Sequence, residues 1–200
     1  VYLAHGISIR TTAAVLGTIG GLLITLGVSL WAVDSMRLTG TASDDSLVLM
    51  GEIPGLDMSS ILMCGMLLAG LGALNDVTIT QVSTVWELHA ANPAMSRRRL
   101  FTQGMAVGRD HIASTVYTLA FAYVGTALPM LMAAALMQRS TVDLLQVAQI
   151  SEEIARTLTA SVGLILAIPL TTVIAAWLAP VAPAKPYEEH EGIAAEGRDL

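Results

Sequence analysis

Four long apolar stretches constrain this chain more than any other feature of its sequence. The first reads "TAAVLGTIGGLLITLGVSLWAV" over residues 12–33, and the others occupy residues 59–86, 112–137 and 158–178. An α-helix needs about 20 mostly apolar residues to cross a bilayer, because each residue adds about 1.5 Å of length. Each stretch reaches that length. The sequence therefore predicts an all-α integral membrane protein, a polytopic helical bundle with about four spanning helices.

The composition supports this fold class and excludes one kind of partner. Hydrophobic residues make up 54% of the 200-residue chain and charged residues only 13%, whereas soluble domains are about 25% charged. The net charge of −6 disfavours a nucleic-acid partner, whose phosphates attract basic surfaces. The single cysteine, Cys64, permits no intrachain disulfide.

Two amphipathic segments and a polar tail lie outside the four stretches. The segments "SRRRLFTQGMAVG" and "STVDLLQVAQISEEIART" are predicted to form interfacial helices on opposite membrane surfaces. Residues 180–200 are rich in proline and then acidic, a composition typical of disorder. We therefore expect a transmembrane domain over residues 1–179 and a disordered cytoplasmic tail over 180–200.

The distribution of arginine predicts how the chain is oriented. The segment between the second and third stretches carries Arg97, Arg98, Arg99 and Arg109, whereas residues 34–57 hold one arginine among five carboxylates. Positive charge marks the cytoplasmic side of membrane proteins. The arginine segment and both ends of the chain are thus expected to be cytoplasmic, in a multi-pass protein of the cell membrane.

The second stretch contains an ionisable residue where one is costly. In "GALNDVTITQV", residues 72–82, Asp76 falls on a helical stripe of small and polar residues. A charged group inside a membrane faces protein or water and is a functional candidate by default. We predict that Asp76 binds a proton or another cation. The residues expected to form a hydrated pocket around it are Asn75, Thr80, Thr115 and Thr118.

A second group of polar residues is predicted to form a cytoplasmic gate. Taking Gly72 and Ala122 as the middle of the membrane places Arg109 level with Glu87, so we expect these two to pair. Asp110 and His111 follow directly on Arg109. The gate hypothesis therefore comprises Glu87, Arg109, Asp110 and His111.

Simpler interpretations apply to the same residues. The threonines could bond only the backbone or a neighbouring helix, the charges at the ends of the stretches could be ordinary interfacial charges, and Asp76 could serve structure alone. Asp76, Asp110 and His111 could in principle bind a metal, but they lack tight ligand spacing. Gly17 and Gly21 form a small-xxx-small pattern typical of helix packing. No cofactor, metal site or catalytic residue is expected, because the chain lacks Ser-x-x-Lys, His-Glu-x-x-His and Gly-x-Ser-x-Gly patterns.

Several long motifs carry a resemblance to a known family. In order, "LAHGISIRTTAAVLGT", "GALNDVTITQVSTVWELHAANP", "VGRDHIASTVYTLAFAYVGTALPMLM" and "EEIARTLTASVGLILAIPLTT" resemble the core of the YibE/F-like membrane proteins. The resemblance implies a longer protein with further spanning helices upstream and an extracytoplasmic segment. The order of elements is also similar to the second half of SecD/SecF and RND-type membrane domains, which couple proton movement to work through carboxylates in a central helix. By that similarity the coupling carboxylate is Asp76.

Together these features predict a secondary transporter or permease driven by a proton or cation gradient. Its expected partners are the lipid bilayer, the N-terminal part of the same protein, an ion or small solute, and another copy or a paralogous membrane protein. The alternative is a scaffold or accessory subunit in export or envelope assembly that transports nothing. The substrate cannot be read from the sequence.

Overall fold

The computed structural model describes residues 2, 6–136 and 141–181, so most of the predicted tail lies outside the described residues. Within them the chain is helical and contains no strand. The long helices are α2 (Ile9–Met36), α4 (Met58–Ala91), α5 (Arg97–Leu136) and α7 (Ala148–Leu178). Short helices connect or end them: α3 (Asp44–Glu52), α6 (Thr141–Leu145) and the 3₁₀ helix η1 (Ala179–Val181).

The predicted helical membrane bundle is confirmed. The helices α2, α4, α5 and α7 are all long and apolar enough to cross a bilayer, with mean hydropathies from 1.6 to 2.2 over their most apolar windows. Many large apolar side chains point away from the bundle, among them Leu23, Trp31 and Phe121. In water such a surface would be costly, but in lipid it is expected. The chain is therefore a membrane-embedded protein.

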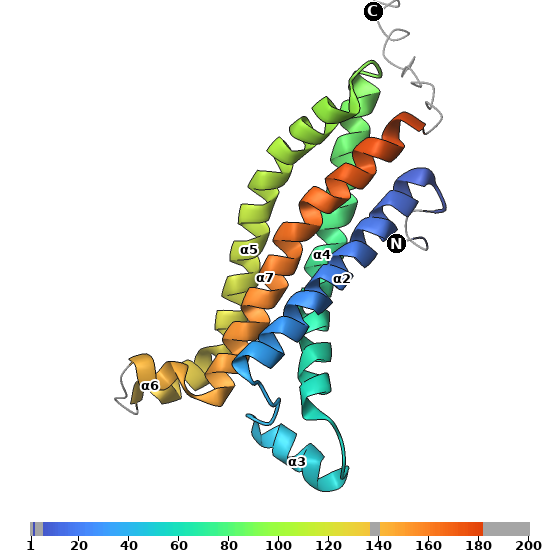
Figure 1. Ribbon diagram of the computed structural model, residues 1–200. Helices are drawn as coiled ribbons and strands as arrows, with labels where there is room; N and C mark the ends of the chain where they lie inside the picture. Colours follow the sequence, from blue (N-terminus) through green and yellow to red (C-terminus); the bar gives the residue numbers. More distant parts are fainter. Residues whose placement is uncertain (1, 3–5, 137–140, 182–200) are drawn as a thin grey trace, which may run out of the picture.

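Helix α7 packs against each of the other long helices (Figure 1). Small residues permit the close approach. A Cβ added at Gly17 would lie 2.5 Å from Thr171 Oγ1, and one at Gly21 would lie 2.9 Å from Ala167 Cβ. The predicted packing role of these two glycines is confirmed, and α7 is the neighbour they serve.

The two ends of the bundle differ in what they carry (Figure 1). The start of α2, the turn over residues 92–96 and the end of α7 lie together, and we call this the turn end. Helices α3 and α6 lie at the opposite end, called here the α3 end. Helices α4 and α5 meet at the turn and diverge toward the α3 end.

The connecting segments depart from the prediction in three ways. The arginine-rich segment is no separate interfacial helix but the first turns of α5, and residues 148–157 are likewise the first turns of α7. No proline interrupts either junction, so the helix continues. The unexpected helix is α3, in which Ser43 caps a first turn carrying Asp44 and Asp45. It exposes Leu47, Val48, Leu49 and Met50, as a helix lying on a bilayer surface would.

Candidate ion-coupling site

Asp76 lies near the middle of the membrane-spanning part of the bundle. The midpoint of the predicted first span, residues 12–33, falls beside Gly21, where a Cβ would lie 2.7 Å from Leu74 Cδ1. Asp76 follows Leu74 by two residues, or about 3 Å along the helix. By this count the carboxylate lies close to the middle of the predicted spans.

The side chain of Asp76 faces away from the other three long helices. It is exposed, whereas Leu74, Val77 and Thr78 on either side are buried in the bundle. Gly72, one turn earlier on the same stripe, has no atom within 4 Å of its Cβ position. Among the described residues Asp76 has no hydrogen bond or ion pair. The small and polar stripe predicted for this helix exists, but it lies on the outside of the described bundle.

Three polar residues of α5 lie at nearly the same depth. Gly108 would place a Cβ 3.0 Å from Ile168 Cγ2, next to the Ala167 that packs on Gly21. Arg109, Asp110 and His111 follow Gly108 directly and so lie within about one helical turn of that level. His111 is half-buried, and its Nε2 atom is buried without a hydrogen-bond partner among the described residues.

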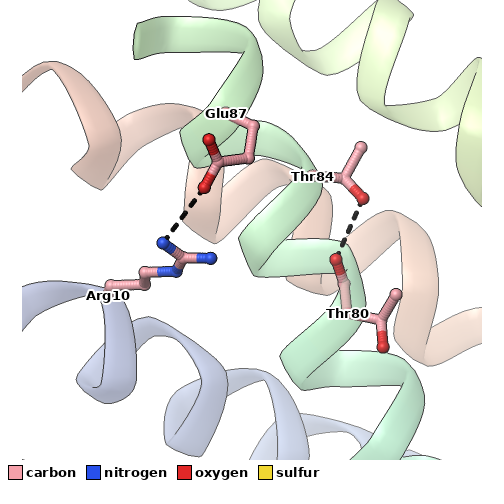
Figure 2. A network of polar contacts seen from close by, with 4 residues as sticks. All are labelled: Arg10, Thr80, Thr84 and Glu87. Carbon is pink, nitrogen blue, oxygen red and sulfur yellow. Dashed lines mark hydrogen bonds and ion pairs between the residues drawn. The ribbon is translucent and has the colours of Figure 1, made fainter. Parts of the chain in front are cut away.

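Glu87 stands apart from these residues, at the turn end. Its carboxylate pairs with Arg10 of α2 at 3.3 Å (Figure 2), so the expected Glu87–Arg109 pair is wrong. The reason is register. The turn over residues 92–96 starts α5 at Arg97, and Gly108 then packs against Gln81. Six residues, or about 9 Å, separate Gln81 from Glu87.

The remaining predicted pocket residues scatter around the two helices. Thr80 and Thr118 are exposed, and Asn75 and Thr115 are half-buried. The hydroxyls of Thr115 and Thr118 donate to the carbonyls of His111 and Ser114 in their own helix. Their hydrogen bonds thus follow the simpler interpretation. No hydrogen bond or ion pair of the described residues joins any of these four side chains to Asp76.

The bundle interior holds a polar residue that the sequence interpretation missed. Gln81 is 3% exposed, and its Nε2 donates to the carbonyl of Gly104 at 2.9 Å and to Thr172 Oγ1 at 2.8 Å. One side chain of α4 therefore bonds both α5 and α7. A glutamine inside an apolar stretch was the available signal, since a polar group there needs partners.

A cleft of about 420 Å³ opens between α2 and α4 beside the Arg10–Glu87 pair. Arg10 lines it together with Ser8, Thr11 and Ser83. Ser83 belongs to the same stripe as Asp76, two turns along the helix. The part of the stripe nearest the turn end therefore borders a cleft large enough to hold water.

Metal binding has little support in the geometry. In the part of the chain that the structure describes, no three His, Cys, Asp or Glu side chains gather closely enough to hold a metal ion. Asp76, Asp110 and His111 share a depth but form no such group.

Comparison with known proteins identifies the family. The sequence profile described as YibE/F-like protein matches residues 1–181. The chain belongs to the YibE/F-like family. No curated protein and no solved structure matches it, so the weaker similarity to SecD/SecF and RND-type domains rests on the order of elements and a short motif.

Proposed function

We propose that this YibE/F-like chain is the membrane-embedded part of a secondary transporter or permease energised by a proton or cation gradient. In this proposal Asp76 is the group that binds and releases the ion. The observation that supports it most is the position of Asp76 near mid-membrane, on a face that the other long helices leave open. A charged residue at the centre of a membrane helix costs roughly 2.5–3.5 kcal/mol in insertion measurements.

The neighbouring groups fit proton exchange. His111 lies within about one turn of the depth of Asp76, on the adjoining helix. The Nε2 atom of His111 is buried without a hydrogen-bond partner among the described residues, so the proposal includes this imidazole as a second proton-binding group. The Arg10–Glu87 ion pair would then control the access of ions to the cleft at the turn end.

The orientation belongs to the proposal as well. The turn end carries Arg97, Arg98 and Arg99 and is assigned to the cytoplasm. Ser43 and Ser96 lie at opposite ends of the bundle. With Cys64 replaced by alanine, cysteines at these two positions should react with an impermeant thiol reagent from opposite sides of the membrane. Labelling from one side only would contradict the four-span topology.

The scaffold hypothesis predicts different contacts for Asp76. A structural carboxylate should bond a neighbouring helix, and Asp76 bonds none within the described residues. This favours an ion-binding role over one in holding these helices together.

The decisive test replaces Asp76 in the full-length protein reconstituted in liposomes. Asp76→Asn keeps the shape of the side chain but cannot ionise, so ion flux driven by a pH gradient should be lost while the Tm stays unchanged. Asp45→Asn, on exposed α3, is the matched control and should retain flux. Full flux in Asp76→Asn across the pH range would favour the scaffold.

A further inference from the structure

Three successive arginines begin α5 at the turn end of the bundle (Figure 1). The first turn of this helix holds no acidic residue, and the nearby Glu87 is already paired with Arg10. Arg98 and Arg99 are exposed. Within residues 2, 6–136 and 141–181, neither of their guanidinium groups makes a hydrogen bond or an ion pair. The described part of the protein therefore leaves both positive charges uncompensated.

A cavity of about 360 Å³ lies beside these two arginines. All of its lining side chains are polar and none is acidic: Ser96, Arg98, Arg99, Thr102 and Gln103. The Thr102 hydroxyl donates to the Arg98 carbonyl, whereas the two guanidinium groups keep their donors for another acceptor. A phosphate group suits such a site, because its oxygens accept the paired N–H donors of arginine.

The helix rise places this cavity at the boundary of the hydrocarbon core. Gly108 of α5 packs against Ile168 of α7, at the level of the middle of the predicted first span. Arg99 precedes Gly108 by nine residues, which is about 14 Å. The hydrocarbon core of a bilayer is about 30 Å thick, so half of it is about 15 Å. The backbone of Arg99 therefore lies where the lipid headgroups begin.

Trp177 of α7 indicates the same level independently. It follows Ile168 by nine residues, again about 14 Å, and is 62% exposed. Tryptophan is enriched at the interface between hydrocarbon and headgroups. The Cζ atom of Arg97 lies 5.0 Å from the centroid of the tryptophan ring, within the range of a cation–π contact. Arg97 is thus held against α7, and the next two arginines line the cavity at headgroup level.

We propose that this cavity binds the phosphate group of an anionic phospholipid from the leaflet at the turn end. The guanidinium groups of Arg98 and Arg99 donate to the phosphate oxygens, and Gln103 supplies a further amide donor. An anionic headgroup fits better than a zwitterionic one, because no acidic side chain lines the cavity to receive a choline group. The depth favours a lipid over free phosphate, since lipid phosphates lie just outside the hydrocarbon core. The site does not depend on the role of Asp76.

The test measures lipid binding to the detergent-purified full-length protein by native mass spectrometry. The protein is titrated with dioleoyl phosphatidylglycerol, with dioleoyl phosphatidylcholine and with inorganic phosphate, and a Kd is obtained for each. The parent should bind phosphatidylglycerol more tightly than the other two. Arg98→Gln combined with Arg99→Gln should raise the Kd for phosphatidylglycerol by about 25-fold, because one basic residue near an anionic membrane surface contributes about fivefold. The double Arg→Lys variant keeps both charges and should stay within a few fold of the parent.

Matched variants separate this site from general attraction to anionic lipid. Arg37→Gln removes an exposed arginine from the α3 end and should leave the Kd unchanged. An unchanged Kd in the double Arg→Gln variant with a parental Tm, or equal affinity for the two lipids, overturns the proposal. Displacement of phosphatidylglycerol by an equal concentration of inorganic phosphate would identify a free anion as the ligand and overturn the assignment to lipid.

The acidic C-terminal sequence is the rival occupant of the arginine cluster. Residues 182–200 contain five carboxylates and two basic residues, and they follow η1 at the turn end. A protein that lacks residues 182–200 should bind phosphatidylglycerol with the affinity of the parent. A gain of tenfold or more on their removal would make this segment the occupant of the cluster and would overturn the lipid site.

Discussion

Gly21 is the position where a single added side chain should disturb the bundle most clearly. A Cβ there would lie 2.7 Å from Leu74 Cδ1 and 2.9 Å from Ala167 Cβ. Leu74 can change its rotamer, but the Cβ of Ala167 moves only with the backbone of α7. Gly21→Val should therefore push α2 away from α7 near the middle of the membrane.

The magnitude follows from a matched position on the same helix. Gly27 has nothing within 4 Å of its Cβ position and is exposed, so Gly27→Val makes the same change in helix propensity without a clash. Overpacking a tight contact costs about 1–3 kcal/mol. For a protein of this length 1 kcal/mol corresponds to roughly 2–4 °C in Tm. We expect Gly21→Val to melt several degrees below Gly27→Val.

Thermal unfolding of the detergent-extracted protein, followed by tryptophan fluorescence, measures this difference. Gly27→Val should melt close to the parent, because its side chain enters lipid or detergent. Equal melting temperatures for the two variants would refute the close packing of α2 on α7.

Three further predictions concern single contacts. Gln81→Leu removes two interhelical hydrogen bonds, each worth about 0.6 kcal/mol on average in a membrane, so it should lower the free energy of unfolding by about 1 kcal/mol in SDS titration. Gly40→Ala should destabilise more than Gly55→Ala under thermal unfolding: both glycines have positive φ, 72° and 88°, but only at Gly40 would the Cβ overlap the Met58 carbonyl oxygen. The Asp57 carboxylate accepts hydrogen bonds from the hydroxyl groups of Ser60 and Ser59. These bonds, that of Ser60 most of all, hold the pKa of Asp57 below the ordinary value of 3.8. The stabilisation by Asp57 is therefore present above pH 3.8 and lost as the pH falls through the lowered pKa, so Asp57→Asn should show a smaller drop in Tm between pH 5 and pH 3 than the parent; equal drops would contradict the cap.

The four spanning helices could be predicted because hydropathy records the contact between side chains and lipid. Their ends could not. Leucine and phenylalanine follow the arginines at the start of α5, and a helix that begins at Arg97 continues through them into the apolar part without a break. Amphipathic character indicates where a helix meets the membrane surface, but it carries no signal that separates one helix from two.

The sequence could not predict which face of α4 is buried in the bundle. Both sides of this helix are largely apolar, because lipid and protein interior select the same side chains. Polar Thr78 and Gln81 are buried, while Leu68 is exposed. Contacts with the neighbouring helices decide which face of α4 is buried. Thr18 of α2 bonds the Thr78 hydroxyl at 2.7 Å, and α5 and α7 supply the partners of Gln81.

The depth of the candidate site depends on register rather than on hydropathy. The sequence-based depths align the centres of the second and third apolar stretches. That alignment shifts α5 along α4 from its position in the structure, and it places Arg109 level with Glu87. In the structure the short turn over residues 92–96 fixes the two helices against each other, and Gly104 and Gly108 then pack against Gln81. The same register that separates Arg109 from Glu87 brings His111 close to the level of Asp76. The similar depth of Asp76 and His111 is thus a consequence of two uncharged features, the length of this turn and the two glycines that pack against Gln81.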